Sequence, residues 1–303
     1  MNTMELGKSG LHVPQIGLGC MRMSGLSAKE ARSMIDKSLD LGIDFFDHAD
    51  IYGKGESEEV FANAIEPSLR EKMTLQSKCG IRNGFFDFSK DHIISSVEGS
   101  LKRLNTDYLD ILLLHRPDAL MEPEEVAEAF SELESAGKVR HFGVSNQNPM
   151  QMELLKKHLD QDLIVNQVQL SLMQTVMLDH GFNVNMENAP AVNRDGEIIE
   201  YCRVNDISLQ AWSPFQHGMI EGAFIGNKDF PAINEKLQEV ASRYGVTDSA
   251  IAIAWIMRHP AGIQPIVGTM NKQRLEDISK ASDVSLTREE WYELYRAAGN
   301  DLP

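Results

Sequence analysis

The chain has 303 residues, of which 42% are hydrophobic and 24% are charged, and its formal net charge is −16. This length suits an α/β barrel, and the composition is ordinary for a globular protein. The acidic balance without any basic run argues against nucleic acid as a partner, and no apolar run approaches the ~20 residues that cross a bilayer, which argues against membrane insertion.

Cysteine usage and the N-terminus indicate the cellular compartment. Cys20, Cys79 and Cys202 are scattered without the spacing of a zinc site or a disulfide framework, which favours a reducing environment. The first residues, "MNTMELGKSGLHVP", are too polar for a secretory signal. We therefore predict a cytoplasmic protein, and the sequence leaves open whether it is a monomer or a small homo-oligomer.

The chain begins with residues 4–15, which predict a small hairpin around a glycine turn. Eight short runs then predict strands, and most are continuously apolar, as parallel strands buried on both faces require. These runs are residues 15–21, 43–47, 73–78, 110–115, 140–146, 163–170, 207–214 and 263–269.

Helical patterns separate the predicted strands. Residues 27–42 carry a capping box at Ser27 and Glu30 and a stop signal at Gly42. Further helices are predicted within residues 89–105, 123–138, 247–260 and 287–299, of which 247–260 is uniformly apolar and expected to be well buried.

This alternation predicts one closed (β/α)8 TIM barrel over residues 1–303, with an N-terminal β-hairpin and an extra C-terminal helix. The glycines do not form the GxGxxG turn of an open dinucleotide-binding sheet. Residues 170–197 are predicted to be a long loop of mixed character, and such loops usually shape a site or are mobile.

Ionisable residues stand where three neighbouring strands are predicted to end. Asp47 closes the second strand with Tyr52 in the loop beyond it, Lys78 closes the third and His115 closes the fourth. Taken singly, each has an ordinary structural explanation as a helix cap, a loop residue, a surface charge or a core histidine. Because catalytic groups of such barrels gather at the C-terminal ends of the strands, we expect the four to converge.

These four residue types together support proton transfer to a carbonyl oxygen. A tyrosine is a weak acid near pKa ~10, and an adjacent lysine cation is expected to lower that pKa. Asp47 would hold Lys78 charged, and His115 would orient the carbonyl group or relay the proton. None of these groups supplies electrons, so a hydride donor must bind beside them.

A metal-dependent barrel hydrolase is the competing enzyme hypothesis. It would use Asp47, His48, Asp50, His115 and Asp118 as ligands. Such hydrolases often begin with His-x-His on a strand, and the chain has no such motif. A lysine at the barrel mouth would also repel a divalent cation, so we expect no metal.

Seven motifs, in this order, carry a resemblance to a known family: "FFDHADIYG", "LQSKCG", "YLDILLLHRPD", "GKVRHFGVSN", "VNQVQLSL", "AWSPF" and "PIVGT". Nearly the whole chain resembles the aldo-keto reductases. The resemblance implies a barrel that binds NADPH in extended form, with NADH less favoured, and reduces the carbonyl group of a small aldehyde or ketone to an alcohol. It also implies a catalytic tetrad of Asp47, Tyr52, Lys78 and His115, with Tyr52 as the general acid.

The same resemblance implies contacts with each part of the cofactor. Residues after the fifth and sixth strands would hold the nicotinamide carboxamide, Trp212 would stack on the nicotinamide ring, and residues after the eighth strand would hold the adenosine end. The implied cofactor residues are Gly19, Cys20, Met21, Asp47, Ser145, Asn146, Gln167, Trp212, Ser213, Pro214, Phe215, Gly268, Thr269, Met270, Arg274 and Asp277.

The sequence departs from the family pattern at two places. His48 replaces a small or hydroxylated residue, and in an extended segment its side chain would point away from that of Asp47. Met270 replaces a basic residue of many NADP-specific members, which leaves Lys272 or Arg274 to bind the 2′-phosphate. A non-catalytic alternative also remains, since some chains of this type are NADP-binding regulatory subunits of membrane channels.

Overall fold

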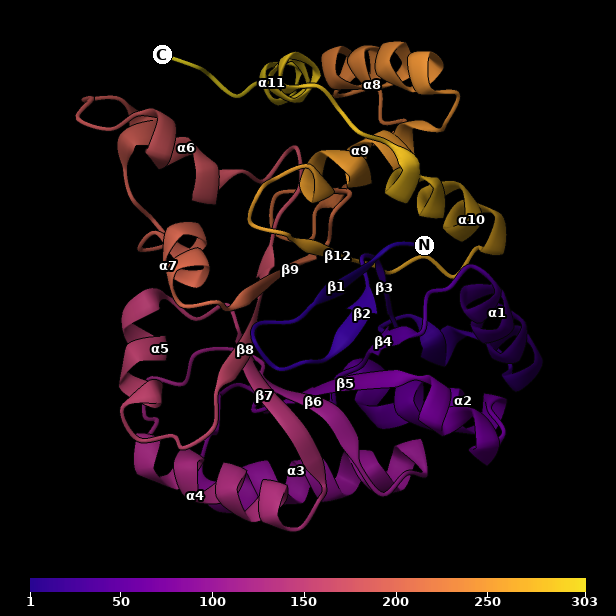
Figure 1. Cartoon of the computed structure of the whole chain (residues 1–303), viewed down its shortest axis with the longest axis vertical. Coiled ribbons are helices and arrows are strands. Elements are labelled where there is room, and N and C mark those ends of the chain that lie inside the picture. The colour runs from indigo at the N-terminus through magenta and orange to yellow at the C-terminus, as the bar shows by residue number, and fades with distance from the viewer.

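The computed structural model describes residues 1–303 and has eight parallel strands closed into a barrel in the order β12-β3-β4-β5-β6-β7-β8-β9 (Figure 1). All eight predicted strands are confirmed. Their bounds are β3 (Gly17–Gly19), β4 (Phe45–Asp47), β5 (Thr74–Cys79), β6 (Leu109–Leu114), β7 (Val139–Ser145), β8 (Leu163–Gln169), β9 (Ser208–Trp212) and β12 (Gln264–Val267).

Helices surround the barrel. The predicted capping box is present, since the Ser27 side chain accepts a hydrogen bond from the Glu30 backbone and the Glu30 side chain accepts one from the Ser27 backbone. The helices are α1 (Ala28–Asp40), α2 (Glu56–Ala64), α3 (Lys90–Leu104), α4 (Pro123–Ser135), α5 (Pro149–Lys156), α6 (Val176–Phe182), α7 (Ile198–Val204), α8 (Pro231–Tyr244), α9 (Asp248–Met257), α10 (Lys272–Ser279) and α11 (Arg288–Ala297). None of them has the length and apolar character needed to cross a membrane.

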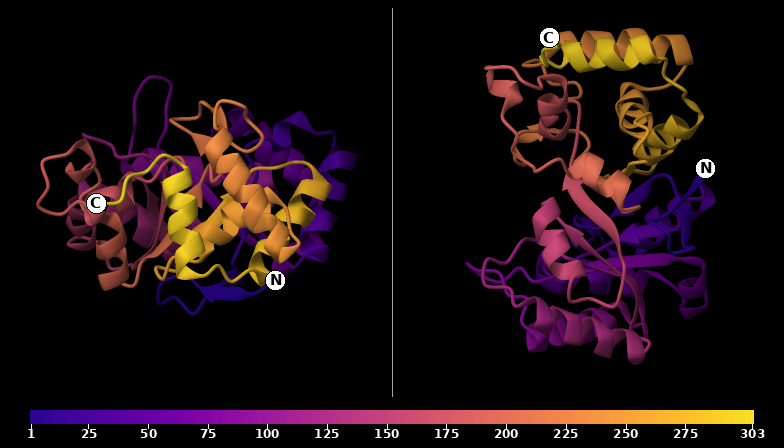
Figure 2. Two further views of the ribbon diagram at one scale, coloured as in Figure 1. Left: turned by 90° about the horizontal axis from the view of Figure 1, so that it is seen from above. Right: turned by 60° about the vertical axis from the view of Figure 1, so that its left-hand side comes forward.

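Both predicted additions to the barrel are present. The N-terminal hairpin pairs β1 (Thr3–Glu5) with β2 (His12–Pro14) in antiparallel register. Its Leu6 and Val13 pack with Phe45, Ile111 and Leu113, so the hairpin contributes to the apolar cluster inside the barrel. The C-terminal helix α11 lies beside α8 at one end of the molecule (Figure 2).

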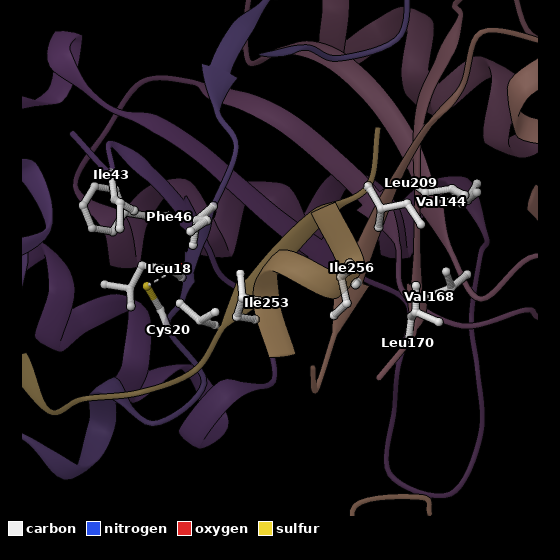
Figure 3. Close-up of a cluster of buried hydrophobic side chains, with 14 of the residues drawn as sticks. Leu18, Cys20, Ile43, Phe46, Val144, Val168, Leu170, Leu209, Ile253 and Ile256 are labelled. Atoms are coloured by element: carbon white, nitrogen blue, oxygen red, sulfur yellow. Dashed lines mark hydrogen bonds between the residues drawn. The ribbon is translucent and has the colours of Figure 1, made fainter. Parts of the chain in front are cut away.

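The main hydrophobic core lies between the barrel strands and the helices. Figure 3 shows part of it, where Leu18 and Leu209 of the strands lie around Ile253 and Ile256 of α9. Every residue from Ala250 to Ile256 is buried, as the apolar pattern of 247–260 predicts. This packed layer holds the strands in register, and their register positions the polar groups at one end of the barrel.

Candidate active site

A cavity of about 900 Å³ lies at the C-terminal ends of the barrel strands. Most of the predicted site residues line it. They are Gly19, Met21, Asp47, Tyr52, His115, Ser145, Asn146, Gln167, Trp212, Ser213, Pro214, Phe215, Gly268, Thr269, Met270 and Arg274. Parallel strands all present their carboxyl ends to the same end of the barrel, and for this reason segments far apart in sequence meet here.

Lys78 links the Asp47 carboxylate to the Tyr52 hydroxyl. Its ammonium donates to one carboxylate oxygen of Asp47 at 2.8 Å and to the Tyr52 hydroxyl at 3.1 Å, and it lies 2.7 Å from the other Asp47 oxygen in the same ion pair. A third acceptor is the backbone carbonyl oxygen of His48, at 2.8 Å. The Lys78 side chain is completely buried, so these protein acceptors take the place of water around the charge.

The strand register explains how these side chains meet. Asp47 of β4 lies opposite Gln76 of β5, and Lys78 follows Gln76 by two residues, so both face the barrel interior. Tyr52 begins a short 3-10 turn, where Gly53 adopts a positive φ of 58°. A side chain at Gly53 would come within 2.6 Å of the Ser24 hydroxyl, so the turn that aims Tyr52 requires glycine.

Glutamines hold the Asp47 carboxylate from inside the barrel. Gln76 and Gln167 donate to one of its oxygens at 2.7 and 3.1 Å, and both also donate to the side-chain oxygen of Gln210. Gln210 in turn donates to Gln264. The carboxylate is thereby oriented toward Lys78 by amides from two other strands, which fixes the geometry of the ion pair.

The pKa of Tyr52 differs from the expectation. Burial raises the pKa of Tyr52, and this effect outweighs the lowering by the Lys78 ammonium. Burial also works against the charged form of Lys78, but attraction to Asp47 exceeds it and raises the pKa of Lys78. At neutral pH Tyr52 is therefore a protonated phenol hydrogen-bonded to the Lys78 cation, so the site holds a proton that could be transferred.

His115 lies across the cavity floor from Tyr52. The two rings meet edge to face with centroids 6.1 Å apart. Burial, with the nearby charges of Lys78 and Arg116, holds the pKa of His115 well below its usual value, so the ring is neutral at neutral pH. Its Nδ1 is buried without a partner, so Nε2 is the ring nitrogen available for a hydrogen bond with a molecule in the cavity.

The remaining cavity residues form two polar groups along its length. Near the tetrad, the Trp212 indole donates to Asn146 at 3.1 Å and Asn146 donates to Ser145 at 2.7 Å. Asn146 and Ser213 have positive φ values of 58° and 52°, a strained backbone that concentrates at functional sites. At the far end, Arg274 stands in the first turn of α10.

Three residues predicted to contact the cofactor do not line the cavity. The Cys20 side chain is fully buried in the core, so only its neighbours Gly19 and Met21 line the cavity. Asp277 lies outside the cavity, one helical turn beyond Arg274, where it accepts a hydrogen bond from Gln273. The same helix geometry directs Lys272 to the Ser33 hydroxyl of α1, at 2.7 Å.

The residues of the metal-site hypothesis do not converge. His48 packs against the Phe61 ring at 4.7 Å, away from Asp47, and both of its ring nitrogens are buried without partners. Asp118 accepts hydrogen bonds from backbone amides of Phe88 and Leu120. No group of three histidine, cysteine, aspartate or glutamate side chains in the chain is placed to hold a metal ion.

The structure adds residues that the sequence prediction missed. Arg116, Ile81 and Ile220 line the cavity, the last from the hairpin between β10 (Gln216–His217) and β11 (Gly222–Ala223). Arg116 could have been found, because it directly follows His115. Residues 170–197, predicted to be a long loop, contain α6 and line no part of this cavity.

The pKa of Asp50, a residue between Asp47 and Tyr52 in the sequence, predicts how stability depends on pH. Burial and the nearby Glu58 carboxylate raise the pKa of Asp50 to about 7. An unfolded aspartate titrates near 3.9, so between about pH 4 and 7 the folded state holds a proton that the unfolded state has lost. Stability should therefore fall as pH rises through this window, by at most about 1.4 kcal/mol per pH unit.

We expect Asp50→Asn to remove this fall, because asparagine keeps the uncharged form at every pH. The variant should have a larger free energy of unfolding than the unmodified protein at pH 8 and nearly the same one at pH 4, measured by urea denaturation. Asp160→Asn, at an exposed position, is the matched control. Parallel stability curves for Asp50→Asn and the unmodified protein would contradict the assignment.

A closed parallel barrel with ionisable groups at the C-terminal ends of its strands is the arrangement of a barrel enzyme. A model of the aldo/keto reductase family matches residues 15–298, and the chain belongs to this family. The chain is an NAD(P)H-dependent carbonyl reductase.

Curated relatives and solved structures agree with this placement. The chain is 38% identical to the oxidoreductase YcsN of Bacillus subtilis, over 95% of this chain and 94% of that one. It is 34% identical to a 6-dehydroglucose reductase of Agrobacterium fabrum, over 90% and 89% of the two chains. An aldo/keto reductase of Klebsiella pneumoniae, solved with NADP and acetate, has a TM-score of 0.80 and 26% identity, with coverage of 99% and 96%.

Proposed function

We propose that the protein reduces an aldehyde or ketone to an alcohol with NADPH, and that Tyr52 is the general acid. One observation carries the proposal. At the cavity floor, the buried Lys78 ammonium donates to both Asp47 and the Tyr52 hydroxyl. A phenol beside a held cation is suited to protonate a carbonyl oxygen, because the cation stabilises the phenolate that remains.

Each member of the tetrad has a separate role. The carbonyl carbon would accept a hydride from the nicotinamide of NADPH held in this cavity. Tyr52 gives its hydroxyl proton to the carbonyl oxygen, and Lys78 stabilises the resulting phenolate. Asp47 keeps Lys78 charged and in place. The neutral His115 directs an N–H at the carbonyl oxygen and so positions it for the proton transfer.

The shape and residues of the cavity fit a nicotinamide dinucleotide. Trp212 offers a flat indole face, and Ser145, Asn146 and Gln167 offer hydrogen-bonding groups beside it for a carboxamide. The cavity continues to the first turn of α10, where backbone N–H groups and Arg274 favour a phosphate. The NADP complex of the Klebsiella pneumoniae reductase supports the choice of NADP over NAD.

The direct test is turnover. Oxidation of NADPH and NADH should be followed with a panel of aldehydes, dicarbonyls, quinones, steroids and sugar aldehydes, the last because of the 6-dehydroglucose reductase relative. We expect turnover with reactive aldehydes and a lower KM for NADPH than for NADH. Tight NADPH binding without turnover of any panel member would instead favour the non-catalytic, NADP-binding alternative.

Arg274 should determine the preference for NADPH. Its guanidinium lies on the cavity, whereas Lys272 is hydrogen-bonded to Ser33. Arg274→Ala is expected to raise the KM for NADPH about 10-fold or more and to change the KM for NADH little, because only NADPH carries the 2′-phosphate. Lys272→Ala is the matched control and should change the KM for NADPH far less. An equal effect of Arg274→Ala on both cofactors would contradict a 2′-phosphate contact.

We further propose that the protein works in the cytoplasm as one domain spanning residues 1–303, as a monomer or small homo-oligomer whose partner is a small carbonyl compound. The three cysteines are free and buried, which supports a reducing compartment. Pairing of β12 with β3 joins the two ends of the chain into the closed barrel, which supports a single domain. Size-exclusion chromatography with light scattering would determine the oligomeric state.

A further inference from the structure

Arg116 is a charged residue of the cavity to which the tetrad gives no role. It directly follows His115 beyond the end of β6 and lines the cavity wall with Ile51 and Ile81. Its guanidinium carbon lies 5.3 Å from the centre of the Trp212 ring. The side chain is half-buried, and burial lowers the pKa of Arg116, against the opposing effect of Tyr52.

The Arg116 guanidinium contacts the Trp212 ring but has no carboxylate or hydrogen-bond acceptor as a partner. The other arginines that are not fully exposed, Arg32, Arg70 and Arg103, each contact a carboxylate, whereas Arg116 has neither an ion pair nor a hydrogen bond. The nearest acid in sequence, Asp118, is occupied by backbone amides. A partly desolvated cation is costly unless it is paired, so this position favours an anionic ligand.

The charge of the cavity also favours an anionic ligand. Arg22, Arg116 and Arg274 line it, while its one acidic residue, Asp47, is neutralised by Lys78. The cavity is therefore positively charged, although the whole chain has a net charge of −16. Local cations in a cleft attract and hold anions even when the surrounding protein is acidic.

The three arginines divide between the two ends of the cavity. Arg22 donates to the Gly268 carbonyl oxygen at 2.8 Å, and Arg274 lies in the first turn of α10, so both belong to the end assigned to the cofactor phosphates. Arg116 stands at the opposite end, beside the tetrad. Ile51, next to Tyr52, and Ile81, just beyond the end of β5, also line the cavity and are apolar.

We propose that Arg116 binds a carboxylate on the carbonyl substrate, so that the preferred substrates are oxo acids whose aldehyde or ketone is separated from the carboxylate by a short apolar spacer. This inference rests on the proposed function. The guanidinium offers a planar pair of N–H donors that matches a carboxylate. The isoleucines contact the spacer, and the carbonyl end reaches Tyr52 and His115.

The experiment compares two aldehydes that differ in charge and hardly in shape, 4-carboxybenzaldehyde and 4-formylbenzamide. The unmodified protein is expected to show a kcat/KM for the acid about 10- to 100-fold above that for the amide, the size expected of a charge-assisted hydrogen bond. The acid's KM should rise with ionic strength and the amide's should not, because salt screens only the charged contact.

Arg116→Gln should bring the ratio of the two kcat/KM values close to one, and Arg116→Lys should restore part of it. Arg22→Gln, which removes a cation from the other end of the cavity, should leave the ratio as in the unmodified protein. No preference for the acid in the unmodified protein, or an equal loss for both aldehydes in Arg116→Gln, would overturn the proposal. Turnover of the neutral amide tests the reductase itself, so failure of the two ideas can be distinguished.

Discussion

Replacing Tyr52 with phenylalanine is expected to lower kcat for NADPH-dependent carbonyl reduction by about 10²- to 10⁴-fold, the usual contribution of a positioned general acid. The Tyr52 hydroxyl lines the cavity and receives a hydrogen bond from Lys78, at 3.1 Å. Without it, neither a proton nor a stabilised conjugate base is available at the carbonyl oxygen. The measurement is single-turnover oxidation of NADPH with a reactive aldehyde.

Two controls separate loss of chemistry from loss of structure. The dissociation constant for NADPH should change little in Tyr52→Phe, because the hydroxyl contributes to the reacting carbonyl rather than to the cofactor end. Tyr108→Phe is the matched control, since Tyr108 lies outside the cavity with its ring between Arg70 and Arg140. An unchanged rate in Tyr52→Phe would mean that another group is the acid.

Replacing Lys78 with methionine should impair both activity and stability. Catalysis should fall at least as far as in Tyr52→Phe, because the phenolate would lose its neighbouring cation. The free energy of unfolding should fall by about 3–5 kcal/mol, the usual result of removing one partner of a buried ion pair. Asp47, with a side chain 3% exposed, would keep its two glutamine donors but lose its counter-charge.

The double variant Lys78→Met/Asp47→Asn tests this explanation. Removing the second charge should recover most of the lost stability, while the rate should stay low, because the acid still lacks its cation. Urea denaturation and steady-state rates on the same preparations give both quantities. A double variant as unstable as Lys78→Met would show that the loss comes from packing around the lysine stem rather than from the unpaired carboxylate.

Much of the fold was predictable because its signals are local. A parallel strand buried on both faces is largely apolar; most of the eight predicted runs met this condition, and all eight are barrel strands. The Ser27–Glu30 capping box and the apolar α9 are likewise specified within a few residues. The convergence of the tetrad also followed, because the ends of neighbouring parallel strands meet at one end of a barrel.

The less successful predictions depend on where a segment packs rather than on what it contains. Residues 170–197 were predicted to be a long loop of undetermined role, but they contain α6 and do not line the cavity, and the hairpin of β10 and β11 borders it instead. Asp277 follows a cofactor-binding turn in sequence, yet the rotation of α10 places it outside the cavity. Neither outcome follows from the local residue pattern.

The sequence was sufficient to establish the barrel, the strand ends and the four chemical groups at its mouth, because strand burial and residue spacing are properties of short segments. The pKa values and the ion-pair partners of the side chains at the site could be found only from the tertiary structure. Burial outweighs Lys78 and raises the pKa of Tyr52, and Arg116 is left without a partner. Desolvation and pairing depend on everything packed around a side chain, and those neighbours come from distant parts of the chain.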